Sequence, residues 1–299
     1  MKRIKTPSHG AQIVRVPLRS KKESITIVAA GDFHIGSDSF NEFAFQEFCK
    51  QMQEEAKLRH VYMILMGDIF DGIMHTDKRF TRSEQIATMT EAQDFMCGAM
   101  KPLTANKRIH IVGSLTGNHE LSYSGGDNDP IYQMYEITGI EPLGSKCFIY
   151  FDLVHAGKVL STIRTVAFHG ASGARTVPGR LRIVRNFLEE NSMTWDEMLR
   201  QNLFAFYGHM HSTRVEENIV AVPEPRNKRF KTCRNWACIT GQFHDTANFK
   251  AGSYPIKKGY SPMPVGYVKI VIAHNSHPTV EAITRGLNPM VDDVIWSDQ

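Results

Sequence analysis

Short apolar runs recur along this chain, and segments with a helical pattern lie between them. The runs at 25–31 (ITIVAAG), 61–67 (VYMILMG) and 108–117 (RIHIVGSLTG) are rich in β-branched residues and end in glycine or contain it. Such runs are typical of buried strands. Residues 40–59 place apolar side chains at helical spacing, and 83–100 begin with a serine suited to cap a helix. Strands that alternate with helices predict an α/β fold.

The later part of the chain is richer in predicted strands than the first part. These strands lie at 147–154, 160–168, 203–207, 213–222, 235–240 and 265–273, with helices at 129–138 and 178–190. We therefore expect that a second sheet packs on the first. The segment at about 223–264 is rich in Pro, Gly, Lys, Arg and Tyr, and it is predicted to be a long functional loop inserted in the domain.

The composition indicates one globular domain spanning 1–299, because 42% of the residues are hydrophobic and 22% are charged. The net charge of +4 allows a polyanionic partner without requiring one. The five cysteines form no CxxC pair, which favours reduced thiols. We find no apolar core of a signal peptide and no run near the ~20 residues of a membrane span. We expect a cytoplasmic protein with no membrane partner.

Side chains that can bind metals follow five of the predicted strands. In open α/β sheets, ligands bind beyond the carboxyl ends of the strands. Any one of these residues would fit an ordinary turn, but five strand ends in succession predict a site. The residues are Asp32 and His34; Asp68 and Asp71; Asn118, His119 and Glu120; His169; and His209 and His211.

Two Asp, one Asn and four His of this group form a mixed oxygen and nitrogen ligand set without a thiolate. Such a set suits Mn²⁺, Fe²⁺ or Zn²⁺ better than Ca²⁺ or a structural zinc ion. Seven ligands are too many for one ion and suit two ions if one carboxylate bridges them. Two-metal sites stabilise the attacking and leaving oxygens of a phosphoryl displacement. We expect two divalent ions, with Mn²⁺ as the first choice and Fe²⁺, Zn²⁺ or Ni²⁺ as alternatives.

The motif set as a whole resembles that of the calcineurin-like metallophosphoesterases. Asp32-x-His34, Gly67-Asp68-x-x-Asp71, Gly117-Asn118-His119-Glu120, His169 and Gly208-His209-x-His211 follow the family's order between residues 31 and 211. The resemblance implies a two-sheet β-sandwich flanked by helices, with a dinuclear metal site at the carboxyl ends of the strands. It also implies the ligands of each ion: Asp32, His34 and His211 for one, Asn118, His169 and His209 for the other, and Asp68 as the bridge.

The same resemblance implies a phosphoesterase mechanism in which a bridging hydroxide attacks phosphorus in line and two cations offset the charge. His119 is expected near the leaving oxygen, as a proton donor or transition-state stabiliser. Asp71 is expected to orient a ligand through a hydrogen bond. Glu120 stands where many family members have Asp, which keeps the carboxylate and changes its reach by one methylene.

The second motif bears on the substrate. The sequence GDIFDG at 67–72 resembles the second motif of the nuclease subunits in bacterial SbcCD-type DNA repair complexes. The protein phosphatases of the family have Asp-Arg-Gly at the end of that motif, and this chain has no Arg there. We therefore expect a phosphodiesterase or nuclease acting on DNA. Hydrolysis of small nucleotides or phosphodiesters is the first alternative, followed by a phosphoprotein phosphatase and a non-catalytic scaffold.

Candidate substrate contacts lie outside the motifs. Arg175 and Arg180 belong to a Gly-rich loop after His169, where guanidinium and backbone groups suit a phosphate. Lys257, Lys258 and Tyr260 combine basic and aromatic side chains, as single-stranded nucleic-acid channels do. A solvated surface segment is the alternative interpretation of this basic loop. The sequence leaves the oligomeric state open.

Overall fold

The structure is a computed structural model that describes residues 10–72, 85–123, 129–170, 173–174, 176–193, 203–224, 229–245 and 263–284. Its strands form a six-stranded sheet of order β1-β5-β6-β7-β9-β8 and a five-stranded sheet of order β11-β10-β2-β3-β4. The first sheet contains β1 (Ala11–Pro17), β5 (Lys146–His155), β6 (Lys158–Phe168), β7 (Leu203–Tyr207), β8 (Thr213–Glu224) and β9 (Arg229–Thr240). The second contains β2 (Ser24–Ala30), β3 (His60–Leu65), β4 (Ile109–Ser114), β10 (Tyr267–Ala273) and β11 (Thr279–Ile283).

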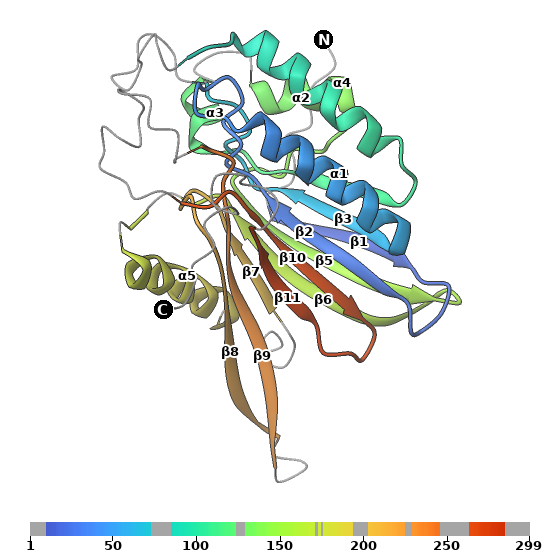
Figure 1. Ribbon diagram of the computed structural model, residues 1–299. Helices are drawn as coiled ribbons and strands as arrows, with labels where there is room; N and C mark the ends of the chain where they lie inside the picture. Colours follow the sequence, from blue (N-terminus) through green and yellow to red (C-terminus); the bar gives the residue numbers. More distant parts are fainter. Residues whose placement is uncertain are drawn as a thin grey trace, which may run out of the picture.

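Helices cover the outer faces of the two sheets (Figure 1). Helices α1 (Glu42–Leu58) and α2 (Met89–Thr104) pack on the five-stranded sheet, and α5 (Val177–Met193) packs on the six-stranded sheet. Helix α4 (Pro130–Thr138) packs against α2 and belongs to the same apolar cluster. The short helix α3 (Asn118–Tyr123) follows β4. The structure therefore confirms a mixed α/β fold of two sheets flanked by helices.

The core consists of three apolar layers, and single strands contribute to two of them. In β2, Val28 faces the helices, whereas Ile27 faces the six-stranded sheet. In β7, Phe204 faces the five-stranded sheet, whereas Ala205 faces α5. Both faces of these strands are buried, which is why their sequences are continuous apolar runs rather than alternating ones.

The structure corrects the expectation of a loop from residue 223. Strand β9 occupies Arg229–Thr240 and pairs with β8 in an antiparallel hairpin, which extends beyond the body of the molecule (Figure 1). The Arg234 guanidinium lies 2.7 Å from a carboxylate oxygen of Glu217 on β8. Opposite charges across an antiparallel pair stabilise it, so part of the basic segment forms a strand. Residues 225–228 and 246–262 of the expected loop lie outside the described residues.

Helix boundaries also depend on local capping. Helix α2 begins at Met89 rather than at 83, because Thr88 and Glu91 form a capping box in which each side chain accepts the other residue's backbone N–H. Helix α4 begins at Pro130 with Asp129 as its cap, close to the predicted start. Within the described ranges, we find no helix whose length and apolarity would let it cross a membrane.

Candidate metal centre

The loops that carry the candidate ligands meet at one end of the two sheets. Strands β2, β3 and β4 run parallel in one sheet, and β6 and β7 run parallel in the other. Backbone hydrogen bonds continue past the ends of β2 and β3, because Asp32 N–H donates to the Gly67 carbonyl at 2.9 Å and His34 N–H donates to the Asp68 carbonyl at 3.0 Å. The carboxyl ends of five strands thus bring their polar side chains together.

The backbone of five candidate ligands is left-handed. The φ angles are 52° at Asp32 and at His34, 46° at Asp68, 61° at His209 and 48° at His211. Residues other than glycine rarely adopt this conformation, and it costs free energy where it occurs. In the described ranges, seven non-glycine residues have a positive φ, and these five are among them. Backbone strain is therefore concentrated where the side chains converge.

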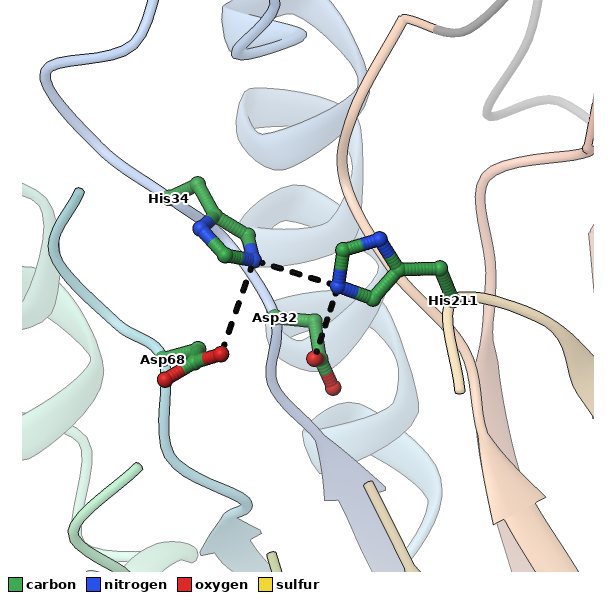
Figure 2. A group of neighbouring side chains, drawn as sticks. All are labelled: Asp32, His34, Asp68 and His211. Atoms are coloured by element: carbon green, nitrogen blue, oxygen red, sulfur yellow. Dashed lines mark hydrogen bonds and ion pairs between the residues drawn. The ribbon is translucent and has the colours of Figure 1, made fainter. Parts of the chain in front are cut away.

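Asp32, His34, Asp68 and His211 form the first group, and Figure 2 shows their side chains directed toward one another. One ligand atom from each lies within 4.8 Å of the others. His34 Nε2 is 3.3 Å from His211 Nε2 and 3.8 Å from Asp68 Oδ2. His211 Nε2 is 3.3 Å from Asp32 Oδ1. The side chain of His211 is 30% exposed while those of the other three are buried, so the group is open to solvent at His211.

A second group contains Asp68 again, together with His169 and His209. His169 Nε2 lies 3.2 Å from Asp68 Oδ2 and 3.2 Å from Asn118 Oδ1. The Nδ1 of His169 is 2.8 Å from the Met66 carbonyl, which can only accept a hydrogen bond. Nδ1 therefore donates, as the second nitrogen of a metal-binding imidazole commonly does. Asp68 is the one carboxylate common to both groups.

The donor atoms of both groups fit divalent ions. His209 Nδ1 is buried and has no hydrogen-bond partner within the described ranges. Buried polar atoms are normally paired, so an unpaired nitrogen in a group of converging donor atoms indicates a missing partner. Carboxylate oxygens and imidazole nitrogens suit first-row divalent metals. These buried groups could hold metal ions.

Burial and charge shift the pKa values in opposite directions within the second group. Burial raises the pKa of Asp68, but His169 and His119 beside it bring that pKa well below its usual value. Burial lowers the pKa of His169, but Asp68 and Asp32 together bring it to about 10. A proton on His169 therefore competes with a metal ion at neutral pH, and ion binding releases that proton.

His119 and Asp71 form a pair beside the first group. His119 Nδ1 lies 2.7 Å from Asp71 Oδ1, and His34 Nδ1 lies 3.5 Å from the same oxygen. The backbone N–H of His119 donates to Asp68 Oδ1 at 2.9 Å. Burial lowers the pKa of His119, but the charge of Asp68 and the hydrogen bond to Asp71 raise it to about 9. The imidazole is therefore protonated at neutral pH.

Glu120 binds backbone rather than another side chain. One of its oxygens accepts the N–H of Gly117 at 2.8 Å and that of Asp68 at 3.1 Å, and the other accepts the N–H of Phe70 at 2.9 Å. The side chain is fully buried, and this burial together with the charge of Asp68 raises the pKa of Glu120 to about 7. Glu120 thus joins the loop after β3 to the start of α3.

Replacing Glu120 is expected to destabilise the protein. Glu120→Ala leaves three buried N–H groups without an acceptor and should lower the free energy of unfolding by about 3 kcal/mol. Urea unfolding of the chelator-treated protein measures the change. Glu120→Gln keeps acceptor capacity and should lose less, and Glu54→Gln on the exposed face of α1 should stay within about 0.5 kcal/mol of wild type. An unfolding midpoint of Glu120→Ala equal to that of wild type would contradict this role.

Two glycines let the backbone approach the shared carboxylate. A Cβ on Gly117 would overlap the backbone nitrogen and Oδ1 of Asp68. Gly67 has a φ of +85°, and a Cβ there would lie 2.8 Å from His169 Nδ1. Both positions therefore require glycine, which explains why each motif begins with it.

His244 is a site residue that the sequence did not reveal. It lies four residues after β9, is buried, and its Nδ1 is 2.9 Å from Ser39 Oγ. Its ring contacts the rings of His34 and His211. Burial lowers the pKa of His244 most, and the charges of the neighbouring His34 and His211 lower it further, so it lies well below its usual value. Like the predicted ligands, His244 follows a predicted strand (235–240), but it lies in the segment that the sequence predicts to be a basic loop.

Of the expected substrate contacts, only Arg180 falls within the described residues. Its Nε donates to the Ala174 carbonyl at 2.8 Å, and its NH1 lies 3.8 Å from the Met263 sulfur. Arg180 thus connects the start of α5 with the segment before β10. Arg175, Lys257, Lys258 and Tyr260 lie outside the described residues.

Comparisons with known proteins add little to this geometry. No family model matches the chain, and no curated protein matches it. Among the solved structures that it resembles is one described as "GAP50 the anchor in the inner membrane complex of Plasmodium". That structure shares 9% identity and a TM-score of 0.33, and the match covers 88% of this chain and 85% of the other. A likeness at this level supports no inference about fold or function.

Proposed function

We propose that this protein is a calcineurin-like metallophosphoesterase that hydrolyses phosphodiesters with two divalent ions, Mn²⁺ first among them. The observation that carries the proposal is the pair of histidine and carboxylate groups that share Asp68. The order of the sequence motifs supports the same family, and two sheets flanked by helices are compatible with its fold.

The chain offers enough ligands for two ions. Asp32, His34 and His211 would hold one ion, and the other would be held by Asn118, His169 and His209, with Asp68 between them. When bound, two divalent cations activate water and offset the negative charge that develops in phosphoryl transfer. The backbone bonds of Glu120 and the close approach of Gly117 fix the carboxylate that both ions would share.

His119 is proposed to protonate the leaving oxygen. Asp71 accepts a hydrogen bond from its Nδ1, so Nε2 is the atom that gives the proton to the ester oxygen. Asp71 acts through His119, because its carboxylate raises the imidazole pKa and fixes the ring. The leaving group therefore departs as an alcohol rather than as an alkoxide.

DNA is the proposed substrate. The GDIFDG motif and the absence of Asp-Arg-Gly favour a phosphodiester over a phosphoprotein. The net charge of +4 is compatible with a polyanion. Binding to DNA phosphates releases counterions, so cleavage of DNA should weaken as salt rises.

A substrate panel with Mn²⁺ tests the proposal. We expect hydrolysis of bis-p-nitrophenyl phosphate that stops in excess chelator and returns with added Mn²⁺, together with cleavage of labelled DNA. The panel includes p-nitrophenyl phosphate, cyclic nucleotides and RNA. Full activity in excess chelator would contradict the metal mechanism. Cleavage of nucleotides without cleavage of single- or double-stranded DNA would replace DNA by a small phosphodiester.

A further inference from the structure

His244 is a buried imidazole beside the metal centre that the proposed reaction does not use. Its ring centroid lies 4.1 Å from that of His34, with an angle of 85° between the rings. It lies 5.3 Å from the centroid of His211, at an angle of 33°. Within the described ranges, the ring of His244 contacts the two imidazoles of the first group, and no ring contact joins it to His169 or His209 of the second group.

The backbone holds His244 from both sides. Phe243 N–H donates to the Asp32 carbonyl at 3.0 Å, and Asp245 N–H donates to the Ser39 carbonyl at 2.6 Å. These bonds join the loop after β9 to the loop after β2, which carries the first ligands. His244 is therefore fixed relative to Asp32.

Two serine hydroxyls fix the ring itself. His244 Nδ1 is 2.9 Å from Ser39 Oγ, which lies 2.9 Å from Ser37 Oγ, and all three side chains are buried. The other ring nitrogen, Nε2, is buried without a hydrogen-bond partner within the described ranges. An unpartnered buried nitrogen costs folding free energy, so packing alone would favour an apolar side chain at this position.

We infer that His244 is a positioning residue that orients the rings of His34 and His211 and so sets the affinity of one of the two ion sites. The inference rests on the proposed function, because it requires two bound ions. No nitrogen of His244 belongs to the groups that converge within 4.8 Å, so His244 acts through the two rings. Removing a residue that orients metal ligands typically costs about 10- to 100-fold in metal affinity.

This role can be tested by titrating the full chain with Mn²⁺ and measuring binding by calorimetry and by electron paramagnetic resonance. His244→Ala should bind one Mn²⁺ as tightly as wild type and the second about 10- to 100-fold more weakly. At Mn²⁺ concentrations that fill both sites of wild type, wild type should show the resonance of two coupled ions, and His244→Ala should show that of an isolated ion.

Milder variants separate ring orientation from general damage. Ser39→Ala keeps the ring and removes its hydrogen bond, and should weaken the same site by about 2- to 10-fold. His244→Phe restores a packed ring and should bind the second ion more tightly than His244→Ala does. His110→Ala is the matched control, because it removes an imidazole stacked on Tyr62 near the opposite end of β4 and should keep both ions.

Two results would overturn the inference: unchanged affinity for both ions in His244→Ala, or an equal loss of both. A parallel assay of ester hydrolysis distinguishes failure of this inference from failure of the proposed function. Wild-type protein that binds two Mn²⁺ ions but cleaves no ester contradicts the proposed function alone. If wild type hydrolyses esters and His244→Ala still binds both ions with unchanged affinity, the inference alone is contradicted.

Discussion

Asp68→Asn is expected to lose both metal ions and to reduce phosphodiester hydrolysis by about 10³-fold or more. Asp68 is the one carboxylate in both ligand groups, so its loss removes a donor from each site at once. The amide keeps the volume of the side chain and its capacity to accept the N–H of His119, so the change acts through charge. Elemental analysis of the purified variant measures the ions, and bis-p-nitrophenyl phosphate measures turnover.

Thermal unfolding gives an independent measure of the same prediction. Mn²⁺ at 100 times its dissociation constant should stabilise wild type by about 2.7 kcal/mol for each site, and it should leave Asp68→Asn unchanged. Asp94→Asn on the exposed face of α2 is the matched control and should behave as wild type. If Asp68→Asn retained two ions and its activity, the shared carboxylate would have no role in holding them.

The strands beneath this centre could be predicted because both of their faces are buried. Strand β7 was expected at 203–207 and spans Leu203–Tyr207, and β2 was expected at 25–31 and spans Ser24–Ala30. A strand covered on both sides must be apolar throughout, so its sequence is unambiguous. The polar residues that follow such a strand stand out for the same reason. This is why the candidate ligands were found without a structure.

Features that depend on partners far apart in the sequence could not be predicted. Edge strand β1 is mostly exposed and takes its place by pairing with β5. The sequence predicts only 235–240 of β9, because the basic residues of its first half, one of which pairs with a carboxylate on β8, are typical of a loop. His244 follows the predicted part of this strand but falls within the predicted basic loop, 223–264, so it was not expected at the site. The role of Glu120 required knowing that three backbone N–H groups from two loops meet at its carboxylate.

His119→Ala is expected to keep both ions and to lose about 10²- to 10⁴-fold in turnover on esters with poor leaving groups. The imidazole is held by Asp71 and belongs to neither group that contains Asp68, so its removal leaves those groups complete. The loss should be much smaller for bis-p-nitrophenyl phosphate, because p-nitrophenolate leaves without a proton. Rates for the two ester classes and the metal content of the variant together measure the role.

The pH dependence of turnover has a defined sign. The pKa of His119 is raised to about 9, so the proton donor is present at neutral pH and is lost as the pH rises through that value. Bound cations lower this pKa, and the Asp71 carboxylate opposes them. Asp71→Asn removes that carboxylate, so the alkaline fall in kcat should move to lower pH. An alkaline limit that stays in place in Asp71→Asn would assign it to another group.

The leaving-group comparison decides whether His119 is an acid or a ligand. A proton donor makes the loss in His119→Ala grow with the pKa of the departing alcohol, while the ion content stays at the wild-type value. A ligand makes the loss equal for all esters, because the missing ion affects every substrate alike. His155→Ala, which changes an imidazole at the end of β5 bonded to the Leu18 carbonyl, should alter neither rates nor ions. If His119→Ala lost the same factor in rate on both ester classes and also lacked an ion, His119 would be a metal ligand rather than a proton donor.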